Sequence, residues 1–113
     1  MLAPAPGSDS ATANGGAKVN NLNSVLIEGK LETDPELTES NGKPTCSFKV
    51  LSLRKDQAFR FRVVTRAHLA EVCAEYLRKD RGVRIVGQLH EENDRIWIVA
   101  EHVEFKPTAK EKG

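Results

Sequence analysis

The sequence predicts an all-β fold, a five-stranded barrel with one helix between its third and fourth strands. Five segments alternate apolar and polar residues with a period of two, which is typical of half-buried strands. One segment, residues 67–82, places its apolar residues at helical spacing instead. The chain has 113 residues, which is enough for one hydrophobic core and too few for two.

The first two strands are expected at residues 24–31 and 45–53. Between them, the Asn-Gly pair at residues 41–42 readily supplies the positive φ angles of a tight hairpin turn. Alternation assigns six of their residues to the core: Val25, Ile27, Leu31, Cys46, Phe48 and Val50.

The third strand is expected at residues 59–66, after a short polar link at residues 54–57. Phe59, Phe61 and Val63 alternate toward the core. The opposite face then carries Arg60, Arg62, Val64 and Arg66.

The helix follows directly. Its apolar residues fall at positions i, i+3, i+4, i+7 and i+8, and are Leu69, Val72, Cys73, Tyr76 and Leu77. Arg78 and Lys79 are expected in its last turn, where basic residues complement the helix dipole, and Gly82 lies just beyond.

Residues 83–90 and 95–105 alternate again, and the link at residues 91–94 is short enough for a hairpin. Val83, Ile85 and Leu89 are expected to point inward, together with Ile96 and Ile98. Five strands with a helix between the third and fourth form the arrangement of an OB-fold.

Both ends of the chain are polar or low in apolar residues. Residues 1–21 are rich in Gly, Pro, Ala, Ser and Asn, and we expect a disordered tail because so little can be buried. Residues 107–113 are expected to form a second, short tail, so the folded domain spans residues 22–106.

Several classes of function have no support in the residues. Cys46 and Cys73 fit no CxxC spacing and are interpreted as buried thiols of a cytoplasmic protein, and the three histidines share no metal-ligand spacing. No catalytic motif is visible, so we expect neither an enzyme nor a cofactor. The longest apolar run, residues 96–100, is too short to cross a membrane.

The chain resembles the bacterial single-stranded DNA-binding protein family. The similar stretches are residues 22–37, with their GxLxxDPEL pattern, and residues 41–48, 62–89 and 100–105; residues 68–89, HLAEVCAEYLRKDRGVRIVGQL, are the strongest. The resemblance implies an OB-fold, a homo-oligomer that is usually a tetramer, and sequence-independent binding of single-stranded DNA. It further implies a role in DNA replication, recombination and repair at the nucleoid.

The chain departs from this family at the positions where members stack bases on aromatic rings. Those positions hold Asp56, Arg60, Arg66 and Asp94. Each base stacked on a ring contributes about 1–3 kcal/mol, so most of the usual affinity depends on contacts that are missing here. The family also commonly ends in a Gly/Pro/Gln-rich linker and an acidic tip, whereas this sequence ends in PTAKEKG.

Arginine is the residue that replaces the rings. Arg60, Arg62 and Arg66 lie in register on one face of the expected third strand, and a guanidinium group can pair with phosphates or lie flat on a base. The net charge is only +1, but residues 54–84 contain nine basic and four acidic residues, a local net charge of +5. We expect DNA to be bound by Arg54, Lys55, Arg60, Arg62, Arg66, Arg84 and Trp97.

Each of these assignments has an alternative. The arginines also fit the ordinary polar outer face of a sheet, and Arg78, Lys79 and Arg81 fit simple dipole complementation. Trp97 is either a base platform or a residue of a subunit contact or barrel edge. The rings of Phe48, Phe59, Phe61, Tyr76 and Phe105 are expected in the core.

Two hypotheses of function remain. The first is a protein that binds single-stranded DNA largely through electrostatics. The second is an OB-fold adaptor of the replication-restart machinery that works mainly through protein–protein contacts. A flat strand edge at residues 24–31 favours a homo-oligomer, a tetramer or at least a dimer.

Overall fold

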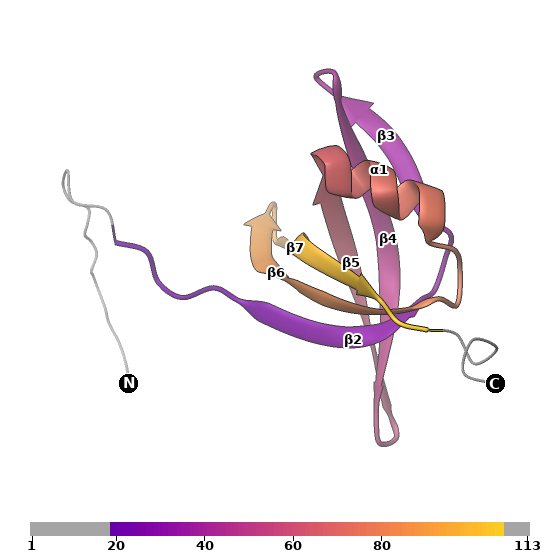
Figure 1. Cartoon of the computed structure of the whole chain (residues 1–113). Helices are drawn as coiled ribbons and strands as arrows, with labels where there is room; N and C mark the ends of the chain where they lie inside the picture. Colours follow the sequence, from indigo (N-terminus) through magenta and orange to yellow (C-terminus); the bar gives the residue numbers. More distant parts are fainter. Residues whose placement is uncertain (1–18, 108–113) are drawn as a thin grey trace.

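The strands close into a barrel, and a helix packs against it (Figure 1). The computed structural model describes residues 19–107. Its elements are β2 (Val25–Leu31), β3 (Glu36–Ser40), β4 (Lys43–Arg54), β5 (Gln57–Arg66), α1 (Ala67–Tyr76), β6 (Gly82–Glu92) and β7 (Arg95–Phe105). The predictions of tails at residues 1–21 and 107–113 lie almost entirely outside the described residues.

Five strands make up the barrel, in the order β2-β6-β7-β5-β4. The pairs Lys30–Leu51 and Leu31–Val50 join β4 back to β2 and close it. Helix α1 lies between β5 and β6, which are the third and fourth barrel strands along the chain. The predicted OB-fold is therefore confirmed.

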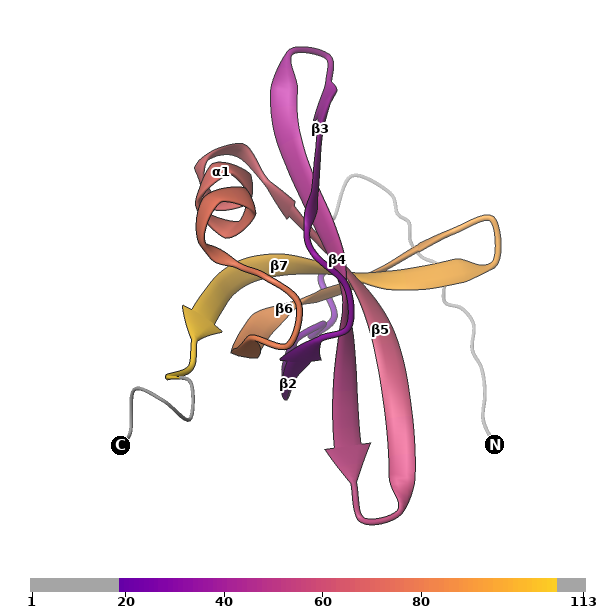
Figure 2. The same cartoon turned by 90° about the vertical axis from the view of Figure 1, so that its right-hand side faces the viewer.

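Strand β3 is an addition to the predicted five strands. It pairs antiparallel with β4 alone, through the turn at Asn41 and Gly42, whose φ angles are 54° and 76°. The turn confirms the Asn-Gly prediction. All five residues of β3 are exposed, so it has no buried–polar alternation that would reveal a strand. Figure 2 shows the β3–β4, β4–β5 and β6–β7 hairpins projecting from the barrel in different directions.

The core forms where the barrel strands meet α1. The helix contributes Ala70 and Cys73, and Leu77 follows directly after it; all three are fully buried. The buried Thr65 hydroxyl donates a hydrogen bond to the Cys46 carbonyl oxygen at 3.0 Å. Cys46 and Cys73 are both buried and free, as expected, and burial raises the pKa of the Cys73 thiol to about 11.

Four residues expected to be buried are exposed instead. Phe59, Tyr76, Leu89 and Ile96 expose 43%, 58%, 48% and 63% of their surface. For the three strand residues the reason is that the hairpins extend past the barrel. The alternation identifies the face on which a residue lies but not where the barrel ends.

The helix is shorter than predicted. It ends at Tyr76, so Arg78 and Lys79 lie beyond its last turn. Arg78 nevertheless donates hydrogen bonds from Nη1 to the carbonyl oxygens of Ala74 and Leu77, at 3.2 and 2.6 Å. Arg78 therefore satisfies carbonyl groups at the C-terminal end of the helix. This agrees with the alternative in which Arg78 complements the helix dipole.

Candidate nucleic-acid interface

Four side chains form a row across the outer face of β4, β5, β7 and β6, which we call the cross-strand row. Lys49 pairs with Arg62 between β4 and β5, and Trp97 pairs with His90 between β7 and β6. The parallel pair Val63–Ile98 places Arg62 beside Trp97. Because adjacent strands are about 5 Å apart, the row spans roughly 15 Å of sheet.

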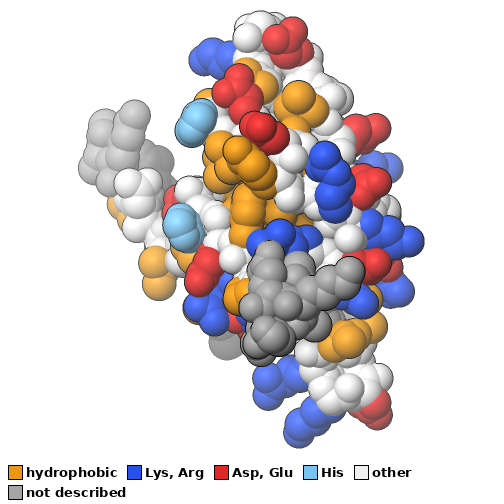
Figure 3. Space-filling view, turned by 45° about the vertical axis from the view of Figure 1, so that its right-hand side comes forward, with side chains coloured by type: hydrophobic (Ala, Val, Ile, Leu, Met, Phe, Trp, Pro, Cys, Tyr) orange, Lys and Arg blue, Asp and Glu red, His pale blue; other side chains and the backbone are white. Residues whose placement is uncertain are grey.

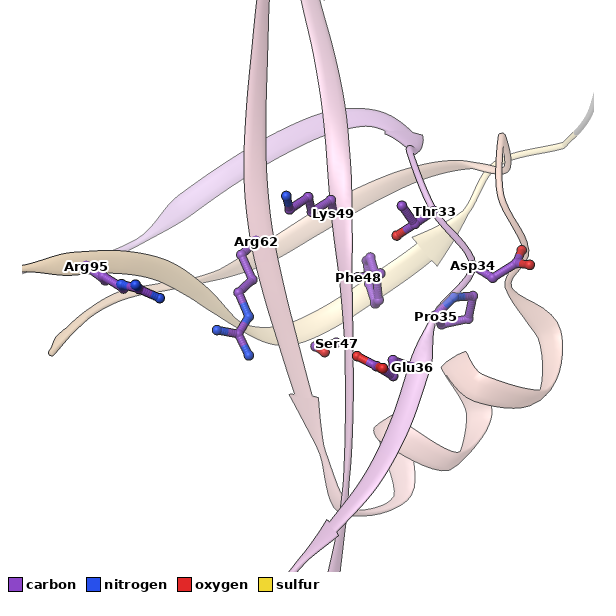
Figure 4. A pocket seen from close by; sticks show the side chains of 9 residues that line it. All are labelled: Thr33, Asp34, Pro35, Glu36, Ser47, Phe48, Lys49, Arg62 and Arg95. Carbon is purple, nitrogen blue, oxygen red and sulfur yellow. The ribbon is translucent and has the colours of Figure 1, made fainter. Parts of the chain in front are cut away.

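A first recess of about 740 Å³ lies on one side of this row. In Figure 4, Arg62 and Arg95 lie on the side formed by β5 and β7, whereas Asp34, Pro35 and Glu36 lie on the side of the segment that leads into β3. The recess therefore has a basic wall and an acidic wall.

A second recess of about 640 Å³ lies between the β3–β4 hairpin and the strands β5 and β7. Its basic groups come from Lys43, Arg62 and Arg66, and its apolar surface includes Val64 and Trp97. The hydroxyls of Thr38, Ser40 and Thr45 add hydrogen-bonding groups. No acidic residue is among the described residues that line it, so this recess suits an anion that also carries an apolar group.

Three of the seven predicted site residues come together in the second recess: Arg62, Arg66 and Trp97. Arg60 lies on the same strand but is held by Glu32, with 2.6 Å between Arg60 Nε and a Glu32 carboxylate oxygen. Arg54 and Lys55 lie at the tip of the β4–β5 hairpin. Figure 3 shows Lys and Arg side chains at the lower end of the molecule, where this hairpin projects.

Arg84 lies apart from the others, at the opposite end of β6 from His90. Its guanidinium forms ion pairs with Glu28 of β2 at 2.6 Å and with Glu104 of β7 at 3.3 Å. The hydrogen bonds from Arg84, and secondarily from Lys106, lower the pKa of Glu28. Arg84 thus links three strands and has its charge balanced by carboxylates.

Three basic residues that line the recesses are not among the predicted DNA-binding residues: Lys43, Lys49 and Arg95. The sequence contains enough information to place Lys49 on the same face as Arg62. A two-residue turn at Lys55 and Asp56 pairs Arg54 with Gln57, and counting back along both strands places Lys49 opposite Arg62. Lys43 and Arg95 had no such signal, because each begins a strand at a hairpin turn whose direction the sequence does not specify.

Other kinds of site find no support among residues 19–107. No group of three or more His, Cys, Asp or Glu side chains in this part of the chain is arranged to hold a metal ion. The one helix described there is too short to cross a membrane.

Comparisons with known proteins agree with the geometry. The model of the single-strand binding protein family matches residues 22–105. Two solved structures share the fold, a deletion variant and the wild-type form of the single-stranded DNA-binding protein from Thermus aquaticus. Their TM-scores are 0.72 and 0.71, each at 24% sequence identity. The alignments cover 77% and 78% of this chain but only 42% of each solved chain, so this chain spans less than half the length of those proteins.

Proposed function

The chain belongs to the single-strand binding protein family, and we propose on this premise that it binds single-stranded DNA along the cross-strand row and the two recesses beside it. The outer face of the second and third barrel strands is the surface that OB-folds use for oligonucleotides. In this chain those strands are β4 and β5, which carry Lys49, Arg62 and Arg66.

One observation carries the proposal most strongly. No carboxylate among residues 19–107 lies within ion-pair distance of Lys49, Arg62 or Arg66, whereas Arg60 and Arg84 are both paired. Cations that lack an internal counter-charge are the groups that gain most from binding phosphate. We therefore propose Arg62 and Arg66 as the centre of the interface, with Arg54 and Lys55 as an extension along the β4–β5 hairpin and with Arg84 outside it.

Binding is proposed to be independent of base sequence. The described lining of the two recesses contains no Asn or Gln, the side chains that read adenine bidentately. Lysine, arginine and hydroxyl groups contact phosphate and sugar, which position a strand without reading its bases. Family membership supports the further proposal of a role in DNA replication, recombination and repair.

A homo-oligomer, with a tetramer as the favoured form, is also proposed. Strand β2 pairs with β4 at Lys30 and Leu31, and within residues 19–107 the edge of β2 before these two residues has no partner strand on that side. Leu26 on this strand is 70% exposed. An unpaired edge with an exposed apolar side chain is suited to pairing with a second copy.

Titration of a labelled oligo-dT, with light scattering to give the mass of the complex, tests the proposal. We expect binding at low salt that is much tighter than binding of a duplex of equal length. No detectable binding at low salt would overturn it and would favour the adaptor hypothesis.

A further inference from the structure

Trp97 is in contact with charged and aromatic groups on both neighbouring strands. The Arg62 guanidinium carbon lies over the indole, 5.9 Å from the ring centroid. The His90 ring lies on the other neighbouring strand, with 4.9 Å between centroids and an angle of 45° between planes. Trp97 is therefore half-buried within the row rather than standing free.

The contact with Trp97 restricts the Arg62 side chain. A guanidinium that lies over an indole gains cation–π attraction, and its planar form stacks where a lysine ammonium cannot. Arg62 also lines both recesses, while Trp97 lines only the second of the two. Arg62 therefore lies at the boundary between the two recesses, where a DNA strand that runs from one to the other would meet it.

We propose that Trp97 is a positioning residue for Arg62, and that the guanidinium held over the indole is the surface on which a DNA base stacks in this chain. The proposal rests on the proposed function and deepens it. In this proposal the ligand base lies on the side of the guanidinium that is away from the indole. Because the guanidinium is already oriented before binding, less side-chain entropy is lost when the DNA strand binds.

Replacement of arginine by lysine isolates the effect of stacking on the guanidinium, because the positive charge is kept and the flat surface is lost. Arg62→Lys is expected to weaken binding of oligo-dT about tenfold, within the range for loss of one stacked base. Arg66→Lys is the matched control, since Arg66 forms no cation–π pair among the described residues. It is expected to weaken binding no more than about threefold. Both variants keep the slope of log K against log salt, because no cation is removed.

Substitution of Trp97 tests the positioning role. Trp97→Leu is expected to weaken binding about as much as Arg62→Lys, and Trp97→Phe, which keeps an aromatic face, is expected to recover most of the loss. The double variant Trp97→Leu/Arg62→Lys is expected to bind no more weakly than the single variants, because both remove one contact. Circular dichroism confirms that each variant is folded.

The outcomes separate the two proposals. If the wild-type chain fails to bind oligo-dT at low salt, the proposed function fails. If the wild type binds but Arg62→Lys and Arg66→Lys weaken binding equally, the positioning role of Trp97 is overturned and the proposed function stands. Strictly additive effects of Trp97→Leu and Arg62→Lys would also overturn it.

Discussion

The Arg60 guanidinium is held by Glu32 at the margin of the proposed interface, and this pairing limits what Arg60 can offer a ligand. The two atoms are 2.6 Å apart, and the hydrogen bond runs from Arg60 Nε to the carboxylate. A phosphate must compete with this carboxylate for the same guanidinium. In the proposed interface, the Glu32 carboxylate therefore competes with DNA phosphate for Arg60.

Removal of the Glu32 charge is expected to strengthen binding. In Glu32→Gln, Arg60 becomes available for an additional phosphate contact, so the affinity for oligo-dT rises a few-fold and the salt slope steepens by about 0.7. Glu104→Gln is the control, because Glu104 contacts Arg84, which lies outside the interface. Fluorescence anisotropy at two salt concentrations measures both. Equal effects of the two substitutions would contradict this view of Glu32.

At the scale of the element, two glycines allow strands to approach each other closely. A Cβ at Gly29 would lie 2.3 Å from the Leu51 carbonyl oxygen, beside the β2–β4 pairs that close the barrel. A Cβ at Gly87 would lie 2.3 Å from the Val99 carbonyl oxygen, where the β6–β7 register shifts. In both cases the obstacle is backbone, which cannot move aside as a side chain can.

Gly29→Ala is therefore expected to destabilise the barrel by about 1–3 kcal/mol, the usual cost of overpacking. Gly82→Ala is a matched control, since its Cβ would meet nothing closer than 3.5 Å. The control is expected to change the free energy of unfolding by less than about 0.5 kcal/mol. Urea denaturation measures both variants. An unchanged stability of Gly29→Ala would show that the strands separate at little cost.

The ion pairs that join β2, β6 and β7 predict a dependence on pH. Hydrogen bonding by Arg84 lowers the pKa of Glu28 below its ordinary value of 4.5 in the folded state. The unfolded chain therefore binds this proton more readily, and the contribution of Glu28 to stability is lost as the pH falls below about 4.5.

Glu28→Gln removes this titration. The stability of the variant is expected to decline less steeply between about pH 5 and pH 3 than that of the wild type, by a small amount because the group is exposed. Glu101→Gln, which removes an exposed carboxylate of β7 that forms no ion pair among the described residues, serves as the control. Unfolding by urea across this pH range gives the comparison, and identical slopes in the wild type and Glu28→Gln would refute it.

The elements differ in how far the sequence specifies them. Period-two alternation identified all five barrel strands, because one face of each strand is buried by the core over part of its length. It could not reveal β3, which buries nothing. It also assigned Phe59, Leu89 and Ile96 to the core, although the hairpins carry these residues beyond the barrel. The length of a hairpin relative to a barrel depends on tertiary pairing, which local periodicity does not contain.

The candidate site shows the same limit. Alternation placed Arg62 and Arg66 correctly on the outer face of β5, but it could not show that Arg60 is paired with Glu32, a residue 28 positions earlier in the chain. Nor could the alternation show that Lys43 and Arg95 line the recesses on this face. Ion pairs and strand-end positions are long-range properties, so a list of cations on one strand overestimates those available to a ligand.

At the scale of the whole molecule, the near-neutral charge hides an uneven distribution. The formal net charge is +1, yet the second recess is lined by Lys43, Arg62 and Arg66 with no acidic residue among its described lining. Glu28 on β2 and Glu32 after it pair instead with Arg84 and Arg60, which do not line this recess. The local field at the interface, rather than the total charge, determines the attraction for a polyanion.

The salt dependence of binding tests this account most directly. We predict that log K for oligo-dT falls linearly with log salt, and that Arg62→Ala/Arg66→Ala makes the slope shallower by about 1.4, at about 0.7 per phosphate contact of a single strand. The charge-matched control Lys79→Ala/Lys106→Ala, which removes two lysines that line neither recess, is expected to retain the wild-type slope. An unchanged slope in Arg62→Ala/Arg66→Ala, or an equal loss in the control, would contradict an interface on the outer face of β4, β5 and β7.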